Sequence, residues 1–391
     1  MRTQVGIVGA GPAGLLLSFL LRRDGIDSVI LENRSRQYVE ERVRAGLLEQ
    51  GTVDLLTELG LADRLHREGL VHHGLALRFG GTSHRVPLTD LTGKVVTIYG
   101  QNEIMKDLID ARLALGEPLH FEAEAVGLED LDTTAPKIRF RQDGVEKTLT
   151  CDFVAGCDGF HGMCRPAIPA YALTIYDREY PFAWLGILSE SEPVSDELVY
   201  VHHARGFALF TMRSPVLSRL YLQVTPDEDI ANWPDARIWE ELHLRLGDTR
   251  GELQEGNVTQ KAITPMRSFV AAPMRHGRLF IAGDAAHIVP PTGAKGLNLA
   301  AADVRVLARA LADHYRGGRS DLLDRYSDIC LRRVWKGQRF SWWMTSLLHR
   351  FEEHSEFDRQ VQLAELDYLT GSPAAMTALA ENYVGLPFEE L

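Results

Sequence analysis

The sequence predicts an α/β protein with three parts: a Rossmann-like nucleotide-binding domain, a second domain built on a β-sheet, and a helical C-terminal region. Three observations predict it. A strand, a glycine-rich turn and an apolar helix follow one another over residues 5–23, short strand-like runs fill 182–224, and 321–391 has a helical pattern. A chain of 391 residues is too long for one ordinary core and is expected to form two or three lobes.

The composition is that of a globular protein in water, with 45% hydrophobic and 25% charged residues. The formal net charge of −12 argues against nucleic acid and an anionic membrane as partners, although a small anion could bind in a local basic pocket. The four cysteines lack CxxC spacing, which favours reduced thiols and a cytoplasmic location. We expect no signal peptide, no membrane span and, since no metal-ligand motif occurs, no metal site.

The stretch Val5–Gly14, VGIVGAGPAG, carries the strongest motif. In a strand–turn–helix unit, Gly9 permits the tight turn, Gly11 lets the backbone approach a pyrophosphate, and Gly14 lets the helix pack closely on the strand. The N–H groups of the first helical turn then face the phosphates. Glu32 ends the next apolar run, where the motif places a partner for a ribose hydroxyl. The alternative is a tight turn with a surface glutamate, but a dinucleotide site explains every part of the pattern.

Three later features resemble ligand-binding edges of such a domain. The strand-like runs Phe153–Gly159 and Leu279–Asp284 both end in a Gly/Asp pair, and the carboxyl ends of parallel strands open on the cofactor crevice. A long helix opens at Gly296 after Pro290-Pro291, and its first N–H groups could face a ligand or could simply be capped. The polar segment 33–46 is either a solvated connection or a contact for dinucleotide phosphates.

The strands of the second sheet place an arginine and a hydroxyl on a common face. Thr211 and Arg213 are two residues apart, as are Arg219 and Tyr221, so each pair shares one side of its strand. A guanidinium group matches a carboxylate bidentately, which makes this face a candidate pocket for an organic acid. The alternative is a surface arginine beside a core aromatic residue.

Three separated motifs occur in order along the chain: GAGPAG at 9–14, CDG at 157–159 and GDAAH at 283–287. Together they resemble the single-component flavoprotein aromatic hydroxylases. The resemblance covers essentially the whole chain, because further runs match it as well: RAGLLEQG at 44–51, PPTGAKGLNL at 290–299, RFSWWMTS at 339–346 and ENYVGLP at 381–387.

The resemblance implies an FAD-binding domain in two parts, 1–174 and 266–320. A substrate-binding sheet domain would occupy 175–265, and a helical C-terminal region at 321–391 would form the interface of a homodimer. FAD would be the cofactor. The residues that the resemblance assigns to it are Gly9, Gly11, Gly14, Glu32, Arg42, Arg44, Gln101, Asp158, Arg219, Asp284, Lys295, Gly296, Leu297 and Asn298.

The resemblance also implies a reaction: hydroxylation of 4-hydroxybenzoate to 3,4-dihydroxybenzoate with NAD(P)H and O₂, through a flavin C4a-hydroperoxide. Arg213 and Tyr221 would bind the substrate carboxylate. Thr211 stands where the family commonly has serine, which keeps the hydroxyl donor and adds a methyl group.

In the same family pattern, Tyr200 contacts the substrate phenol, Tyr383 continues a proton relay, and His72 forms its solvent-side end. The carbonyl group of Pro291 would receive the substrate hydroxyl. A phenolate is attacked by an electrophile faster than a phenol, so the reaction needs such a relay in a dry pocket. His202 and His203 follow Tyr200 and have no role in this pattern.

The resemblance assigns the electron donor to Arg34, Tyr38, Arg42, Arg44, His161 and Arg267. Guanidinium groups near residue 34 favour NADPH, because they could bind its 2′-phosphate. Glu40 and Glu41 weigh towards NADH, which remains the alternative. Other readings of the whole chain are a hydroxylase of another phenolic or amino benzoic acid such as 3-hydroxybenzoate, a flavin-binding protein without oxygenase activity, and an NAD-dependent dehydrogenase.

Overall fold

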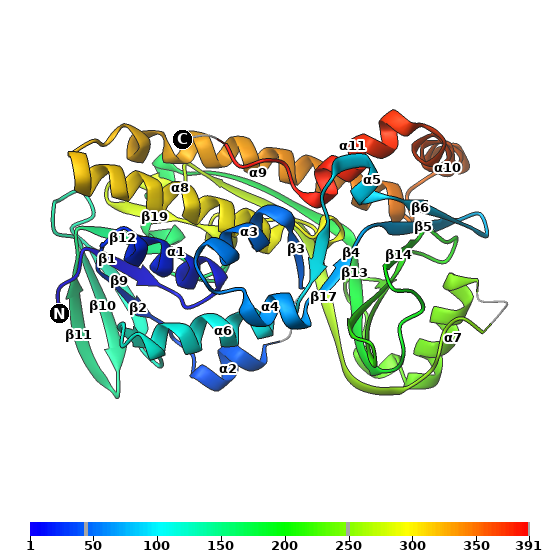
Figure 1. The fold of residues 1–391 in the computed structure, drawn as a ribbon, viewed down its shortest axis with the longest axis horizontal. Helices are drawn as coiled ribbons and strands as arrows, with labels where there is room; N and C mark the ends of the chain where they lie inside the picture. Colours follow the sequence, from blue (N-terminus) through cyan, green and yellow to red (C-terminus); the bar gives the residue numbers. More distant parts are fainter. Residues whose placement is uncertain (43–45, 248–250, 390–391) are drawn as a thin grey trace.

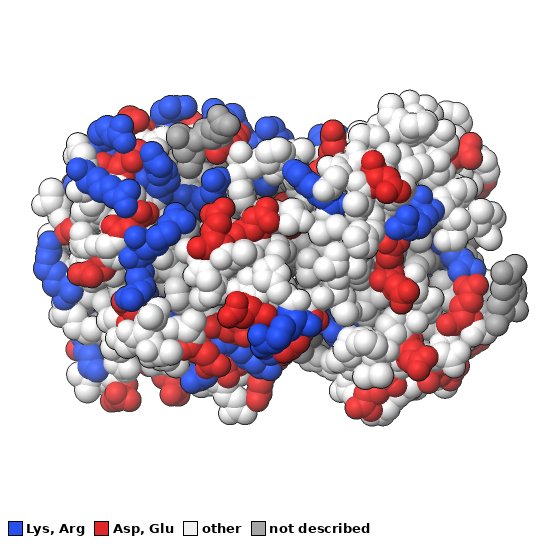
Figure 2. All heavy atoms as spheres, in the orientation of Figure 1, with Lys and Arg blue, Asp and Glu red and all other residues white. Residues whose placement is uncertain are grey.

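The computed structural model describes residues 1–42, 46–247 and 251–389. Two lobes meet at a narrower waist, and helix α9 (Asp321–Leu348) runs along both of them (Figures 1 and 2). The first lobe is built on a mostly parallel sheet and the second on a larger mixed sheet. The predicted α/β class with a helical C-terminal region is therefore confirmed.

The sheet of the first lobe has the order β18-β19-β12-β1-β2-β8, in which only β18 is antiparallel to its neighbour. Its central strand β1 is buried along its whole length between β2 and β12, which explains the uninterrupted apolar run at the start of the chain. The strands are β1 (Val5–Val8), β2 (Ser28–Leu31), β8 (Leu119–His120), β12 (Phe153–Gly156), β18 (Arg275–His276) and β19 (Leu279–Ile281).

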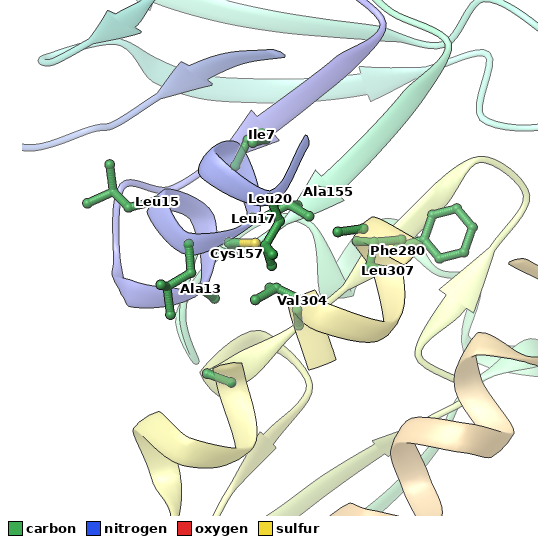
Figure 3. Packing of buried hydrophobic residues seen from close by; sticks show 14 of the residues in the cluster. Ile7, Ala13, Leu15, Leu17, Leu20, Ala155, Cys157, Phe280, Val304 and Leu307 are labelled. Carbon is green, nitrogen blue, oxygen red and sulfur yellow. The ribbon is translucent and has the colours of Figure 1, made fainter. Parts of the chain in front are cut away.

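Helices α1 (Pro12–Arg23) and α8 (Gly296–Gly317) pack against each other and on this sheet. Figure 3 shows Leu17 and Leu20 of α1 beside Val304 of α8 and Ala155 of β12, with Cys157 next to them. All of these side chains are buried. The two helices that begin at the candidate ligand-binding turns are thus held in one rigid core.

The second lobe contains a sheet of order β20-β17-β13-β16-β15-β14-β5-β6. Its long strands β13 and β17 pair antiparallel and run from one lobe to the other (Figure 1). The strands are β5 (Leu75–Phe79), β6 (Thr82–Val86), β13 (Thr174–Glu190), β14 (Leu198–Val201), β15 (Ala208–Ser214), β16 (Leu217–Val224), β17 (Asn257–Ala272) and β20 (His287–Ile288); helix α7 (Asp235–Leu246) covers one face.

The sheet pairing differs from the predicted linear division in two places. Strand β17 runs on to Ala272 and pairs with β20, so residues 266–272 and 287–288 of the predicted second FAD-binding part join the second sheet. Strand β5 pairs parallel with β14, so residues 75–86 join the second sheet although they precede residue 174. Residues so distant in sequence cannot be paired from local pattern alone. The domain boundaries at 174, 265 and 320 stay a prediction. The pairing of β5 with β14 shows that the second sheet also includes residues from the first predicted part.

The remaining strands form two small sheets, and further helices complete the fold. One small antiparallel sheet has the order β11-β10-β9 and another the order β3-β7-β4. Their strands are β3 (Leu47–Glu49), β4 (Leu70–His72), β7 (Val96–Ile98), β9 (Glu124–Glu129), β10 (Lys137–Gln142) and β11 (Val145–Thr150). The further helices are α2 (Arg36–Glu41), α3 (Gln50–Glu58), α4 (Asp63–Glu68), α5 (Leu88–Thr92), α6 (Gln101–Ala114), α10 (Glu356–Gly371) and α11 (Pro373–Val384).

Candidate active site

Each glycine of the turn between β1 and α1 has a different reason to be there. Gly9 has a φ of +101°, and a Cβ there would lie 2.4 Å from the carbonyl oxygen of Cys157. A Cβ on Gly14 would lie 2.1 Å from the carbonyl oxygen of Gly9. A Cβ on Gly11, by contrast, meets nothing within 4 Å. Since α1 has no side-chain cap, its first N–H groups remain available beside this space, which fits a pyrophosphate.

These distances separate a folding role from a cofactor-binding role. We expect Gly14→Ala to lower the unfolding temperature of the apoprotein, because a backbone atom must move to admit the methyl group. We expect Gly11→Ala to leave that temperature unchanged and to weaken FAD binding by roughly tenfold or more, because the methyl group enters the pyrophosphate space. Thermal unfolding and FAD titration check the pair, and wild-type FAD affinity in Gly11→Ala would contradict the assignment.

Glu32 lies at the carboxyl end of β2, beside the glycine-rich turn. Its Oε2 accepts a hydrogen bond from the backbone N–H of Ala10 at 2.8 Å, and its Oε1 accepts one from that of Arg34 at 2.9 Å. The side chain is 8% exposed. A buried carboxylate held in this way is positioned for a ribose hydroxyl, since each oxygen retains a second lone pair.

The second Gly-Asp turn is tied to α8 by a buried ion pair that sequence reasoning did not single out. The Oδ2 atom of Asp303 accepts from the backbone N–H of Gly283 at 3.0 Å and lies 2.6 Å from Nε2 of His287. Burial acts to lower the pKa of His287, but the Asp303 carboxylate outweighs it and raises that pKa overall. Asp284, half-buried, follows Gly283 directly, so this pair fixes where Asp284 stands relative to α8.

Lys295 is buried and directly precedes the first residue of α8. Its Nζ atom donates to Oε1 of Glu49 at 2.6 Å, to the carbonyl oxygen of Tyr383 at 3.2 Å, and to that of Asn382. Burial lowers the pKa of Lys295, and the Glu49 carboxylate opposes this. The charge of Lys295 is compensated by Glu49, and its contacts join β3 to α11; its predicted place near the flavin stays a prediction.

The Asn298 side chain is fully engaged in the fold. Its Oδ1 accepts from Thr52 Oγ1 at 2.8 Å and from the Glu49 backbone N–H, and its Nδ2 donates to the carbonyl oxygens of Leu47 and Ala294. Any contact from the start of α8 to a ligand must come from the backbone N–H groups of the first turn. These groups at Gly296, Leu297 and Asn298 have no partner within the helix and carry its positive dipole end.

The other residues assigned to FAD lie around the same lobe with less specific geometry. Asp158 follows β12, and its Oδ2 accepts from the backbone N–H of Cys164 at 2.8 Å while Oδ1 is buried without a hydrogen-bond partner. Burial raises the pKa of Asp158. Gln101 is the first residue of α6, and Arg42 is exposed after α2. Arg44 lies outside the described residues.

The substrate face of the second sheet brings two arginines and two hydroxyl groups together. Thr211 of β15 lies opposite Arg219 of β16, and Nε of Arg219 donates to the Tyr221 hydroxyl oxygen at 3.3 Å. Arg213 lies at a bulge of β15 and interacts with the same phenol. Burial would raise the pKa of Tyr221, but the Arg219 and Arg213 guanidinium groups outweigh it and lower that pKa. Burial lowers the pKa of Arg213, and Tyr221 opposes this.

Side-chain atoms of Thr211 and Arg219 on this face are buried without a hydrogen-bond partner. They are the Oγ1 atom of Thr211 and the Nη1 atom of Arg219. Orphaned donors beside two like charges indicate a place for an anion, since a carboxylate would satisfy both atoms. The hydroxyl of Thr211 is thus available despite the extra methyl group, and the burial of Arg219 argues against the surface alternative for this face.

Tyr200 and Tyr383 form the predicted pair of phenols. Their hydroxyl oxygens are 2.7 Å apart, and the Tyr200 hydroxyl also lies 3.3 Å from the carbonyl oxygen of Thr292. The rings are 1% and 0% exposed. Burial raises the pKa of both phenols above the ordinary value, with Tyr383 opposing this at Tyr200. Both tyrosines therefore stay protonated near neutral pH and can pass a proton by exchanging hydrogen bonds.

Pro291 lies in the turn that leads into α8. Its carbonyl oxygen accepts the backbone N–H of Ala294 at 2.9 Å, and the residue is exposed. The hydrogen bond of Tyr200 goes to the next carbonyl, that of Thr292. A carbonyl oxygen has two lone pairs, so the predicted contact of Pro291 with a substrate hydroxyl stays a prediction.

His72 ends β4 and is buried, but no hydrogen bond joins it to Tyr383. Neither of its ring nitrogens has a hydrogen-bond partner. Burial is the main cause that lowers its pKa to about 4, against the opposing carboxylates of Glu197 and Asp196. The ring is therefore neutral at pH 7 and able to accept a proton, although its place as the end of the relay stays a prediction.

The buried neutral ring of His72 predicts acid sensitivity. Its pKa is about 4 in the folded protein and near 6.5 in an unfolded chain, so as pH falls below 6.5 only the unfolded state binds the proton. The stability that this group contributes is present above pH 6.5 and is lost as pH falls to about 4, a total of roughly 3 kcal/mol. Urea unfolding at pH 7, 5 and 4 measures it, and His72→Asn is expected to lose less stability than the wild type over that range. An identical slope in the two proteins would contradict this.

An aromatic wall that sequence reasoning missed supports the substrate face. The Nε1 atom of Trp184 donates to Nε2 of His349 at 2.7 Å, and the Trp184 ring lies 4.9 Å from that of Tyr221. Phe207 stacks on both Trp184 and His349. Burial lowers the pKa of His349 to about 3, so it stays neutral and accepts this hydrogen bond. Trp184 and His349 are 165 residues apart, which no local pattern connects.

The residues assigned to the nicotinamide nucleotide make two separate groups of contacts in this structure. The Arg34 guanidinium lies over the Tyr38 ring at 5.1 Å, and both residues are exposed. His161 is exposed in the turn that follows β12, and its ring contacts that of Phe160. Arg267 lies over the same Phe160 ring but already pairs with Asp177 and Glu179. The predicted donor contacts therefore fall in two clusters, and the assignment stays a prediction.

The fold and the two candidate sites, one for a dinucleotide and one for an organic acid, indicate the class of protein, and comparison with known proteins agrees. The family model described as "FAD binding domain" matches residues 2–341. The chain belongs to the FAD-binding family of flavoprotein aromatic hydroxylases. Among described residues, no helix could cross a membrane, and no group of three His, Cys, Asp or Glu side chains is arranged to hold a metal ion.

One known hydroxylase is similar to this chain over its whole length. The chain is 52% identical over 391 residues to p-hydroxybenzoate hydroxylase of Acinetobacter baylyi, covering 100% of this chain and 96% of that one. It is 26% identical to a 3-(3-hydroxy-phenyl)propionate/3-hydroxycinnamic acid hydroxylase of Mycobacterium sp. (strain JLS), over 83% of this chain and 56% of that one. The crystal structure of p-nitrophenol 4-monooxygenase PnpA from Pseudomonas putida DLL-E4 shares the fold, with a TM-score of 0.85, 21% identity and 99% coverage of both chains.

Proposed function

We propose that this chain is an FAD-dependent monooxygenase that converts 4-hydroxybenzoate to 3,4-dihydroxybenzoate with NAD(P)H and O₂. The observation that carries the proposal is that one buried region holds both an anion-binding face and a pair of hydrogen-bonded phenols. A carboxylate at one end of a ring and a hydroxyl at the other would meet these two features. The named relative acts on such an acid.

The anion-binding face would hold the substrate carboxylate. Arg213 and Arg219 supply the positive charge, and the orphaned Oγ1 of Thr211 supplies a further donor. The Tyr221 phenol lies between the two arginines as an additional donor. The Trp184 ring packs against Tyr221 and is itself held by its hydrogen bond to His349. The carboxylate end of the substrate would therefore meet packed side chains rather than loops.

The phenol pair would move the substrate proton. Tyr200 would accept the proton of the substrate hydroxyl and pass its own to Tyr383, 2.7 Å away, while Tyr383 would release its own proton towards the predicted solvent-side end of the relay at His72. A phenolate ring is richer in electrons than a phenol, which favours hydroxylation at the carbon next to the oxygen. The surrounding apolar cluster excludes water, which strengthens each of these hydrogen bonds.

FAD fits the first lobe because the space over Gly11, the uncapped start of α1 and the N-terminal end of α8 all favour a negatively charged ligand. When bound there, it would accept electrons from the nicotinamide nucleotide and activate O₂. The protein would contribute the phosphate contacts at Gly11, the ribose contact at Glu32 and the backbone N–H groups of α8. The positive end of the α8 dipole would stabilise negative charge on the reduced cofactor.

NADPH is the proposed electron donor, with NADH as the alternative. Arg34 and Arg42 are exposed beside α2, where they could bind a 2′-phosphate, whereas Glu40 and Glu41 of the same helix oppose an anion. A cytoplasmic location belongs to the same proposal, because the four cysteines are all free thiols.

A homodimer is also part of the proposal. Phe357, Val361 and Tyr368 lie on one side of α10 and are 75%, 51% and 62% exposed. Large exposed apolar side chains on one helical face are typical of a subunit interface. Light scattering of the purified protein tests this, and Phe357→Glu is expected to shift a dimer to monomers.

Product analysis tests the function. Purified holoenzyme is given NADPH or NADH with 4-hydroxybenzoate, 3-hydroxybenzoate or 4-aminobenzoate, and both donor oxidation and ring products are measured. We expect 3,4-dihydroxybenzoate as the main product and the highest ratio of product to donor oxidised with 4-hydroxybenzoate. Equal or better coupling on another acid would replace the substrate in this proposal. FAD that no donor reduces in the presence of any of these acids would favour a binding protein instead.

A further inference from the structure

A cavity of about 580 Å³ lies in the second lobe, away from the residues assigned to substrate or cofactor. Its walls come from the turn between β5 and β6, the loop after β14, the C-terminal end of α7 and the segment joining α9 to α10. None of the residues assigned above to FAD, substrate or donor lines it. His202 and His203, to which the family pattern gives no role, do line it.

The charged groups of this cavity leave one cation without a partner. Arg78 pairs with Glu252 at 2.9 Å, and Arg245 pairs with Glu241 at 3.1 Å. Arg359 lies 3.4 Å from Glu356, which also lines the cavity. Arg350 is an exposed residue that lines the cavity, and its guanidinium group has no hydrogen bond or ion pair with any described residue. Its backbone N–H and carbonyl groups are both hydrogen-bonded to the side chain of Gln223, which fixes the backbone of Arg350 beside the cavity.

A neutral donor lies in the same cavity. The Nδ1 atom of His203 accepts the backbone N–H of Arg205 at 3.1 Å, so the ring proton is on Nε2. Burial lowers the pKa of His203, and the nearby Arg245 and Arg205 guanidinium groups lower it further, which keeps the ring uncharged at neutral pH. The cavity therefore offers the positive charge of Arg350 and the N–H group of His203, and the rings of His202 and His354 line it as well.

The rest of the lining is largely apolar. Phe79, Phe351, Leu363, Val201 and Leu246 contribute side chains to the walls. A volume of about 580 Å³ falls in the range of sites for small organic molecules, roughly 300–1,000 Å³, and exceeds what a single-ring acid needs. Apolar walls with a single unpaired cation suit an apolar body that carries one negative charge.

We propose that this cavity is a second ligand site, which binds an organic carboxylate with an apolar body larger than one ring. The carboxylate would pair with Arg350 and accept a hydrogen bond from Nε2 of His203, while the apolar body would lie between Phe79, Phe351 and Leu363. A phosphate group suits the cavity less, because its higher charge calls for several unpaired donors and it has no apolar body to fill the remaining volume.

Calorimetric titration of the holoenzyme with 2-naphthoate tests the proposal. 4-Hydroxybenzoate is present at saturation, so the site on β15 and β16 is occupied. The variants are Arg350→Gln and Arg350→Glu, whose side chain has no structural partner to lose, and the matched control is Arg325→Gln, an exposed arginine of α9 outside the cavity. Benzoate and inorganic phosphate are titrated under the same conditions.

We expect one 2-naphthoate per chain, with weaker binding of benzoate and weaker still of phosphate. Arg350→Gln should weaken 2-naphthoate binding roughly tenfold or more, the loss typical of a hydrogen bond to a charged group, and Arg350→Glu should weaken it further. Arg325→Gln should bind as the wild type does. No binding of 2-naphthoate by the wild type, unchanged affinity in both Arg350 variants, or phosphate binding as tight as that of 2-naphthoate would each overturn the proposal. Because the readout is binding at Arg350, it stands or falls separately from the hydroxylation activity.

Discussion

Arg213→Ala is expected to weaken binding of 4-hydroxybenzoate by roughly 100- to 5,000-fold. The substrate carboxylate would enter a buried face whose other cation, Arg219, already shares Tyr221 with Arg213. Removing one partner of a buried ion pair leaves the other charge uncompensated, at a cost of about 3–5 kcal/mol. The dissociation constant can be measured in the holoenzyme by the change in the flavin absorption spectrum that the substrate causes.

Two comparisons make this result specific. Arg325→Ala removes an exposed arginine far from the sheet and should leave the dissociation constant unchanged. Arg213→Lys keeps the charge but not the planar fork, so we expect an intermediate loss of affinity. FAD content and unfolding temperature should stay near wild-type values in all three variants. Wild-type affinity in Arg213→Ala would remove this residue from the substrate site.

Tyr200→Phe is expected to separate cofactor reduction from hydroxylation. The variant keeps the ring and its packing against Phe207 but loses the hydroxyl that lies 2.7 Å from that of Tyr383. Loss of a positioned proton acceptor costs about 10²- to 10⁴-fold in the step it assists. NADPH should still be oxidised when substrate is added, while 3,4-dihydroxybenzoate formed per NADPH falls steeply. The measurement is the ratio of product to NADPH oxidised.

The second phenol provides the control. Tyr383→Phe should lower the same ratio, because the proton that leaves Tyr200 then has no hydroxyl to receive it. The double variant should be little worse than either single one, since both act on one transfer. Losses that multiply in the double variant, or full coupling in Tyr200→Phe, would contradict a shared relay.

Sequence reasoning succeeded where a function requires adjacent residues of a fixed type. The turn at Gly9, Gly11 and Gly14 was predicted because its steric requirements are local, and the structure gives each glycine the expected environment. The common face of Arg219 and Tyr221 followed from the two-residue period of a strand. Tyr200 and Tyr383, 183 residues apart, were paired only through resemblance to a family, and the structure then brought their hydroxyl groups together.

The residues that sequence reasoning missed act across long distances and have ordinary local surroundings. Asp303 is one acid within a long helix, and only the fold places it against Gly283 and His287. His349 follows an aromatic helix and gives no sign that it accepts a hydrogen bond from Trp184. The charge of Lys295 was expected near the cofactor, but its ion pair with Glu49 depends on the packing of β3 against α8.

The position of Tyr383 on α11 has a consequence for biosynthesis. Strands that carry Arg213 and Tyr200 leave the ribosome long before the helix that completes the relay, and Lys295 finds the carbonyl groups of Asn382 and Tyr383 only at the very end. A nascent chain can therefore fold its nucleotide-binding lobe and its large sheet while the reaction chamber is still open to water. Chains that stop before Tyr383 would lack the second phenol of the pair and the carbonyl groups that hold Lys295.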